Sequence, residues 1–238
     1  MSEATASRID ISTSAARMLQ GINIRSPGLV AYQDSWQAMR DFTRERDAST
    51  ADEIWLLQHP QVFTLGQAGK TEHLLSPGDI PVLSTDRGGQ VTYHGPGQLV
   101  MYTLLNLKRA GMGIRQLVSL IESTVIDCLS AYGIEAVSRS DAPGVYVDGS
   151  KIAALGLRVS RGYSYHGLAL NIDADLEPFG RINPCGYRNL EVTSMSELGV
   201  ETTLDSVAQL LSESFVSSFT EGVMSELVRS KQVRPNRK

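Results

Sequence analysis

Cysteine is rare in this sequence, because Cys128 and Cys185 are the only two in 238 residues. Two cysteines cannot form the disulfide framework that stabilises small secreted domains. Neither belongs to a Cys-x-x-Cys or His-x-x-x-His spacing of the kind that holds zinc. The sequence therefore predicts no disulfide and no metal site.

Long apolar runs are also missing. No stretch approaches the roughly 18 apolar residues that a membrane-spanning helix needs, and the N-terminus has no apolar segment of the secretory-signal kind. With 42% apolar and 20% charged residues, the composition is typical of a soluble globular protein. We expect a cytoplasmic protein that does not bind membranes.

Basic charge is sparse outside the C-terminus. The last ten residues carry five basic side chains, whereas the rest of the chain carries 17 of the 22 basic and all 26 acidic ones, a net charge near −9. This balance argues against nucleic-acid binding. We interpret residues 229–238 as a basic flexible tail, and residues 1–20, rich in Ser, Ala and Thr, as a disordered extension.

Residues 21–228 are predicted to form one domain of the α+β class, a mixed sheet flanked by helices. Asp-Gly and Arg-Gly turn signals separate the last three predicted strands, which indicates an antiparallel meander. The apolar patterns predict helices at 36–42, 113–132 and 204–219, and strands at 52–59, 90–93, 98–107, 144–147, 151–159 and 163–172.

The two cysteines occupy different settings. Cys128 lies on the apolar stripe of the helix predicted at 113–132, where a thiol acts as a small hydrophobe. Cys185, in "RINPCGYRN", lies between Pro184 and Gly186, and we expect this bend to expose it. Only a thiolate is a strong nucleophile, so a reactive Cys185 needs a cation nearby. The candidates are Arg181, Arg188, Lys151, His94 and His166.

Lys151 opens the strand "KIAALGLRV", whose alternation puts it on the same face as Ala153, Leu155, Leu157 and Val159. A lysine on an apolar face is either functional or extends to water at the strand end. This strand and "HGLAL" carry small residues, which leave space for a closely packed helix or for a slender apolar ligand.

The segment "DRGGQVTYHGPGQ" combines four glycines and a proline with Arg87 and His94. Such a segment is typical of a backbone that approaches a ligand closely, and an ordinary hairpin is the alternative.

Taken together, "RGGQVTYHGPGQ", "DAPGVYV", "KIAALGLR", "HGLALN" and "RINPCGY" resemble the successive motifs of the lipoate-biosynthesis octanoyltransferases. These enzymes are octanoyl-[acyl-carrier-protein]:protein N-octanoyltransferases. The resemblance runs from about residue 22 to about residue 195. It implies the fold of the biotin and lipoate protein ligases, in agreement with the α+β class predicted from the residues.

The resemblance also implies a role for each motif. Cys185 matches the acyl-thioester nucleophile, and Lys151 matches the lysine that promotes ionisation of this thiol and moves its proton. We expect Ala153 and Ala154 to help form the acyl slot, and backbone N–H groups at Leu155 and Gly156 to bind the oxyanion. The residues matching the acyl-site segments are Arg87, Gly88, Gly89, Gln90, Val91, Thr92, Tyr93 and His94, then Ala154, Leu155 and Gly156, then Gly167, Leu168 and Ala169.

The implied donor is octanoyl-acyl carrier protein. The implied acceptors are lysines in the lipoyl domains of 2-oxoacid dehydrogenase E2 subunits and in the glycine cleavage H protein. Neither ATP nor another cofactor is required, and we expect a monomer. Because carrier proteins are acidic, a local basic patch is expected on this acidic body. Its candidates are Lys108, Arg109, Arg115, Arg158, Arg161, Arg181 and Arg188.

Three alternatives stay open. An ATP-dependent lipoate or biotin protein ligase would need no cysteine nucleophile. A cysteine hydrolase would use His94 or His166 as its base and release the free acid. A non-catalytic acyl-binding module would not depend on Cys185 at all.

Overall fold

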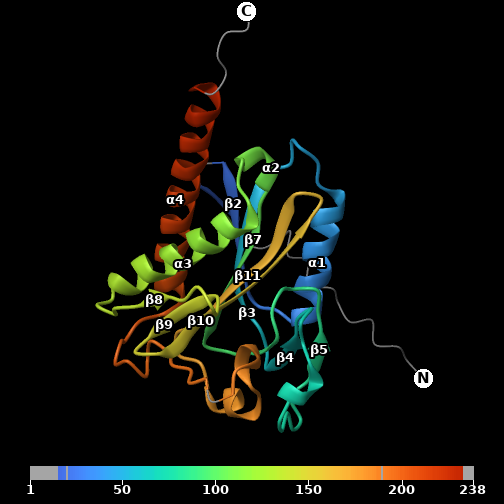
Figure 1. Ribbon diagram of the computed structural model, residues 1–238, viewed down its shortest axis with the longest axis vertical. Coiled ribbons are helices and arrows are strands. Elements are labelled where there is room, and N and C mark those ends of the chain that lie inside the picture. The colour runs from blue at the N-terminus through green and yellow to red at the C-terminus, as the bar shows by residue number, and fades with distance from the viewer. Residues whose placement is uncertain (1–15, 20, 189, 233–238) are drawn as a thin grey trace, which may run out of the picture.

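The structure is a computed structural model that describes residues 16–19, 21–188 and 190–232. Its centre is a mixed eight-stranded sheet of order β1-β2-β3-β7-β11-β10-β9-β8 (Figure 1). Neighbouring strands are antiparallel except for β2 and β3, which are parallel. The strands are β1 (Ala16–Leu19), β2 (Ile22–Leu29), β3 (Asp52–Gln58), β7 (Gln98–Leu104), β8 (Val137–Ser138), β9 (Gly144–Val147), β10 (Ser150–Ser160) and β11 (Tyr163–Asn171).

The predicted meander is confirmed, because β9, β10 and β11 follow one another as antiparallel neighbours. Asp148 and Gly149 connect the first pair, and both have positive φ, 48° and 88°. A two-residue turn with positive φ at both positions matches the twist of a hairpin. The local turn chemistry therefore fixes the register that brings β10 beside β11.

A smaller sheet of order β5-β4-β6 lies next to the end of the first helix (Figure 1). Its strands are β4 (Val62–Leu65), β5 (Val82–Ser84) and β6 (Val91–His94), and its own apolar cluster includes Phe63 and Tyr93. The short helical turns η2 (Thr71–His73), η3 (Glu177–Arg181) and η4 (Pro184–Gly186) belong to this end of the molecule. The small sheet supplies one wall of the pocket described below.

Helices cover both faces of the large sheet. On one face α3 (Ile114–Ser130) and α4 (Leu204–Gln232) form the main core with the sheet, and Cys128 is buried there as predicted. On the other face α1 (Tyr32–Glu45) packs through Met39 against Trp55 of β3 and Tyr102 of β7. The short α2 (Leu107–Ala110) follows β7. The predicted α+β class and mixed sheet are confirmed.

Two boundary predictions need correction. Residues 16–19 were expected in a disordered extension, yet they form β1, which pairs with Ile22–Arg25 through a turn at Gly21 with φ 82°. The last helix was expected to end at residue 219, and the tail to begin at 229, yet α4 continues to Gln232. No proline interrupts the chain before Pro235, so nothing stops the helix earlier. Residues 1–15, 20 and 233–238 lie outside the described part of the chain.

Within that part, no helix combines the length and the apolar character that crossing a membrane requires.

Candidate active site

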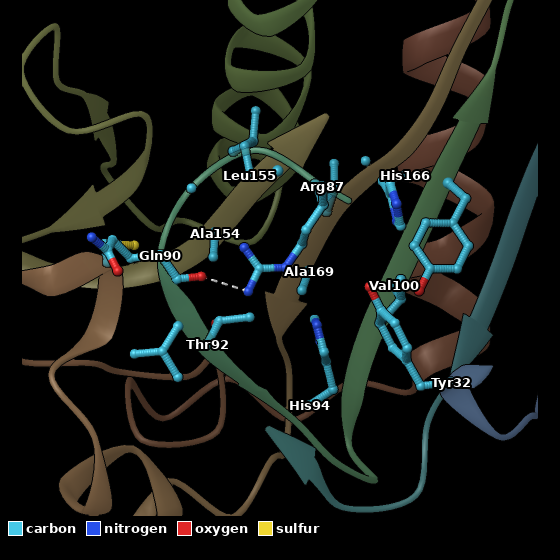
Figure 2. A pocket seen from close by; sticks show the side chains of 17 residues that line it. Tyr32, Arg87, Gln90, Thr92, His94, Val100, Ala154, Leu155, His166 and Ala169 are labelled. Atoms are coloured by element: carbon cyan, nitrogen blue, oxygen red, sulfur yellow. Dashed lines mark hydrogen bonds between the residues drawn. The ribbon is translucent and has the colours of Figure 1, made fainter. Parts of the chain in front are cut away.

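A pocket lies between the large sheet and the small one. The β7, β10 and β11 strands form one wall, β6 and the segment before it form the other, and α1 contributes Tyr32 (Figure 2). The lining residues are Tyr32, Arg87, Gly89, Gln90, Val91, Thr92, His94, Val100, Tyr102, Ala154, Leu155, Gly156, His166, Gly167, Leu168, Ala169 and Cys185.

Small residues on paired strands create the apolar wall. Ala154 pairs with Ala169, and Gly156 pairs with Gly167, across the β10–β11 ladder. A Cβ atom at Gly156 would lie 3.0 Å from Gly88 O, and one at Gly167 would collide with Met101 O. Gly156 therefore lets the segment before β6 approach the sheet, and Gly167 lets β7 approach β11. The sequence had left open a helix or a ligand, whereas a loop and a neighbouring strand take part of this space and the same small residues also line the pocket.

Arg87 holds this segment in place. Its buried guanidinium donates to Thr64 Oγ1 at 3.0 Å and to Thr64 O at 2.6 Å. It also donates to Gln90 O at 2.8 Å, the bond drawn in Figure 2. These bonds join β4 to the loop before β6, so the arginine shapes the wall as well as facing the pocket.

Cys185 lies on a strained bend at one end of the pocket. Its φ is 55°, in the left-handed region that favours glycine, and its thiol is half-buried. The following Gly186, with φ 81°, packs against Gln90, because a Cβ there would lie 3.2 Å from Gln90 Cγ. A strained residue held by its surroundings at a pocket is a common property of functional positions.

Lys151 contacts this thiol. Its Nζ donates to Cys185 Sγ at 3.0 Å and to Pro143 O at 3.2 Å, and it lies 5.1 Å from the centre of the Tyr146 ring. The residue is 3% exposed. Burial alone lowers the pKa of Lys151, but the negative charge of the Cys185 thiolate and the bonds to Cys185 and Tyr146 raise it above its ordinary value. The contacts with Cys185 and Tyr146 therefore offset the cost of burying the Lys151 ammonium.

The strand face predicted for Lys151 is wrong. The register of β10 against β9 shifts between Lys151 and Ala153, so that Ile152 and Ala153 both pack in the main core. Lys151 pairs instead with Tyr146 and faces Cys185. A bulge inserts one residue and reverses the alternation, which a period-two pattern cannot foresee. For the same reason Ala153 belongs to the core and does not line the slot.

The loop that receives the Lys151 ammonium is anchored from α3. Glu122, a buried residue of that helix, accepts a hydrogen bond from Gly144 N at 2.9 Å. Gly144 has φ 143°, and a Cβ there would lie 3.0 Å from Lys151 Cε. The hydrogen bond between Gly144 and Glu122 therefore fixes the loop against which the Lys151 side chain packs.

Most of the predicted acyl-site residues meet in this one pocket, but Tyr93 and Gly88, like Ala153, do not line it, and neither does the catalytic candidate Lys151. Tyr93 points away from it into the cluster of the small sheet, 5.6 Å from the Phe63 ring centre, because alternate residues of β6 face opposite sides. Gly88 binds the sheet edge instead, as its N–H donates to Leu157 O at 3.0 Å. Lys151 lies beside Cys185, outside the lining.

Sequence reasoning missed Tyr32, Val100 and Tyr102, and it considered His166 only as a cation or a base. Tyr32, Val100 and Tyr102 come from α1 and β7, and no local motif marks them, whereas His166 begins the motif "HGLALN". The alternating pattern along β7 could have identified two of them, because Val100 and Tyr102 lie on the same face of the strand, which packs toward α1.

Three of the seven basic candidates are engaged in other contacts. Arg109 pairs with Asp52 at 2.8 Å, Arg181 pairs with Glu177 at 2.7 Å, and Arg161 donates to Arg44 O at 2.8 Å. Arg188 is exposed and follows the Cys185 bend closely. Among the described residues, no three His, Cys, Asp or Glu side chains gather in a way that would hold a metal ion.

Comparison with known proteins places this geometry in a family. Residues 31–216 match the model described as "Lipoyl protein ligase A/B catalytic domain". An octanoyltransferase of Hahella chejuensis is 59% identical over 86% of this chain and 91% of its own length.

Two solved structures share the fold. A bipartite lipoate protein ligase from Thermoplasma acidophilum has a TM-score of 0.65 and 15% identity, and covers 81% of this chain and 82% of its own. Biotin protein ligase from Aquifex aeolicus, in complex with biotin and ATP, has a TM-score of 0.53 and 14% identity, covering 85% and 72%. Together with the high identity to curated relatives, these findings show that the chain belongs to the octanoyltransferases of the lipoyl protein ligase A/B family.

Proposed function

We propose that the chain moves an octanoyl group from octanoyl-acyl carrier protein to a lysine of a lipoyl domain, through a thioester on Cys185. The observation that carries this proposal is the 3.0 Å contact between Lys151 Nζ and Cys185 Sγ, at one end of an apolar pocket. It is supported by membership of the octanoyltransferases, which makes the protein an acyltransferase.

In the first step the Cys185 thiolate attacks the thioester carbonyl of the donor. A bond forms between Sγ and the acyl carbon, the donor C–S bond breaks, and the departing thiolate takes a proton from the Lys151 ammonium. One thioester replaces another, so the step needs no ATP. In the second step the acceptor amine displaces Cys185, an amide forms, and the proton released by the amine returns to Lys151.

The pocket suits the acyl chain. An octanoyl group has six methylenes, and burial of each stabilises the bound state by about 0.8 kcal/mol, or about 5 kcal/mol in all. We assign the oxyanion donor to Leu155. Successive residues of a strand direct their backbone N–H and C=O groups to opposite sides of the strand. Leu157 O accepts a hydrogen bond from Gly88 N–H, so the N–H of Leu155 points to the side of β10 on which Gly88 lies. The N–H of Gly156 points to the other side, toward β11.

Intact mass spectrometry after mixing with octanoyl carrier protein tests the proposal. We expect an octanoyl adduct on Cys185 that is lost in Cys185→Ala and retained in Cys128→Ala. Cys128 is the matched control, because burial raises the pKa of its thiol to about 11. An adduct on another residue, or no adduct at all, contradicts the thioester mechanism.

The alternatives make different predictions. A ligase would require ATP, so transfer to a lipoyl domain in its absence opposes that function. A hydrolase needs a histidine at the thiol, but His94 Nδ1 is bonded to Gln98 at 2.7 Å and His166 Nε2 to Asp86 at 2.9 Å, while Lys151 contacts Cys185. A binding module would be unaffected by Cys185→Ala.

We further propose that Arg188 helps to dock the acidic donor, since it is exposed beside the Cys185 bend. Arg188→Glu should slow acylation by octanoyl carrier protein more than acylation by octanoyl-pantetheine. Arg40→Glu is the control, because Arg40 is an exposed arginine of α1 that does not belong to the candidate basic patch. Equal slowing with both donors would contradict this docking role.

We expect a cytoplasmic monomer, and light scattering tests the oligomeric state.

A further inference from the structure

The pocket has two chemically different ends. Cys185 lies at the end marked by Gln90, because Gly186 packs against that side chain. Figure 2 shows His166, Tyr32 and Val100 together on the side of the pocket away from Gln90, with Ala169 between. An acyl chain attached to Cys185 would therefore direct its terminal carbons toward His166.

His166 is held there in an unusual conformation. It is 1% exposed and has φ 60° inside β11. Its backbone N–H donates to Met39 Sδ at 3.4 Å rather than to a neighbouring strand. A non-glycine residue in this conformation inside a strand is strained, and such strain is typical of functional positions.

Neighbouring groups fix the protonation of the His166 ring. Asp86 accepts hydrogen bonds from Trp36 Nε1 at 2.7 Å and from Tyr165 OH, and its Oδ1 lies 2.9 Å from His166 Nε2. A carboxylate only accepts, so Nε2 carries the proton and donates. Burial lowers the pKa of His166 and outweighs the opposing effect of Asp86, so the ring is neutral. The remaining nitrogen, Nδ1, is therefore an acceptor with a free lone pair.

This Nδ1 is buried and has no hydrogen-bond partner among the described residues. The contrast with His59 is informative, because both of its ring nitrogens are bonded, to Val30 O at 2.6 Å and to Tyr102 OH at 2.7 Å. Buried polar atoms are nearly always paired, so an unpaired acceptor on a residue that lines the pocket points to a ligand that supplies the donor.

We propose that the His166 end of the pocket recognises a hydrogen-bond donor on the last carbon of the acyl chain. The enzyme then accepts medium-chain acyl thioesters with a terminal hydroxyl or thiol, in addition to octanoyl. The inference rests on the proposed function, because it requires that the pocket hold the acyl chain of the Cys185 thioester. A hydroxyl there would donate to His166 Nδ1, which an alkyl end cannot do.

Three thioesters on the same carrier protein test the proposal in the unmodified enzyme: octanoyl, 8-hydroxyoctanoyl and 8-fluorooctanoyl. Fluorine resembles the hydroxyl in size but donates no hydrogen bond. We expect 8-hydroxyoctanoyl to acylate Cys185 about five- to tenfold more efficiently than 8-fluorooctanoyl, as one additional hydrogen bond would allow. An apolar site would reject the hydroxyl chain by about a hundredfold relative to octanoyl. Equal rates for the hydroxyl and fluoro chains would overturn the proposal. A rate for the hydroxyl chain about a hundredfold below that for octanoyl would also overturn it.

Two variants locate the effect. His166→Phe removes the acceptor and should abolish the preference for hydroxyl over fluorine, measured as a ratio within one preparation. Tyr165→Phe disturbs the same Asp86 network but keeps Nδ1, and should leave the ratio within about twofold. If His166→Phe keeps the preference for hydroxyl over fluorine, the assignment of the acceptor to His166 Nδ1 is contradicted. If that variant does not fold, the comparison of the three thioesters in the unmodified enzyme decides. Failure of all three chains to acylate Cys185 would instead refute the proposed function.

Discussion

At the scale of residues, the proposed chemistry depends on one thiol and one ammonium. Local signals singled out Cys185 and left Lys151 as one of five candidate cations, and the resemblance to the octanoyltransferases implied that the two act together. Sequence reasoning could not predict the face of Lys151, since the bulge at Ile152 depends on pairing with a separate strand. Nor could it find His166 Nδ1, whose lack of a partner is a property of the packed structure.

Two substitutions of Lys151 separate its charge from its proton. Lys151→Met removes the cation beside Cys185, and we expect both alkylation by iodoacetamide at pH 7 and octanoyl transfer to fall, the latter by about 10²- to 10⁴-fold. Lys151→Arg keeps the charge but cannot release a proton. It should retain much of the alkylation rate and lose transfer. Equal losses in both assays for the arginine variant would argue against a proton-transfer role.

At the scale of elements, the pocket is a product of strand pairing. The sequence predicted β10 and β11 and their small residues, and the register aligns Ala154 with Ala169 and Gly156 with Gly167. Tyr32 and Tyr102 were not predicted, because α1 and β7 reach the pocket only through the order of strands in the sheet. Periodicity predicts which elements exist, but not which of them become neighbours.

The contact from α3 to the Gly144 loop has a testable effect on Lys151. Glu122→Leu leaves Gly144 N–H without its acceptor, so the loop that holds the Lys151 ammonium should shift, and transfer should fall about tenfold or more. Glu122→Gln keeps an acceptor oxygen and should restore most of the activity. The pH dependence of Cys185 alkylation reports on the lysine directly. An unchanged alkylation profile in Glu122→Leu would contradict a positioning role.

Gly156 tests the close approach of the two sheets. In Gly156→Val the added Cβ would lie 3.0 Å from Gly88 O and 3.1 Å from Arg87 Cδ, so the segment before β6 must move. We expect kcat to fall at least tenfold and the free energy of unfolding to fall by about 1–3 kcal/mol. Turnover assays and urea unfolding measure both, and unchanged turnover would show that this backbone does not form the site.

At the scale of the whole molecule, the large sheet separates two environments. The face under α3 and α4 is a continuous apolar core. The opposite face combines apolar packing under α1 with buried histidines, including His59 and His94. The overall class followed from the sequence, but the concentration of polar groups on one face arises only when distant segments meet.

The buried histidines predict a loss of stability in acid. Burial lowers the pKa of His59 from 6.5 to about 4, and burial also lowers the pKa values of His94 and His166. Between pH 6.5 and 4 the unfolded chain binds protons that the folded protein excludes, so the free energy of unfolding falls as the pH falls. His59 alone accounts for about 3 kcal/mol. Urea unfolding across this range should show the decline, with a shallower slope in His59→Gln; identical slopes would contradict the assignment.

The ends of the large sheet carry a consequence for the solution behaviour of shortened chains. Both edge strands are short, with four residues in β1 and two in β8. Removal of residues 1–19 would leave the N–H and C=O groups of Ile22–Arg25 without the partners that β1 provides. Such an exposed edge is a template for pairing with a second molecule. We therefore expect a chain that lacks β1 to aggregate more readily than the full chain.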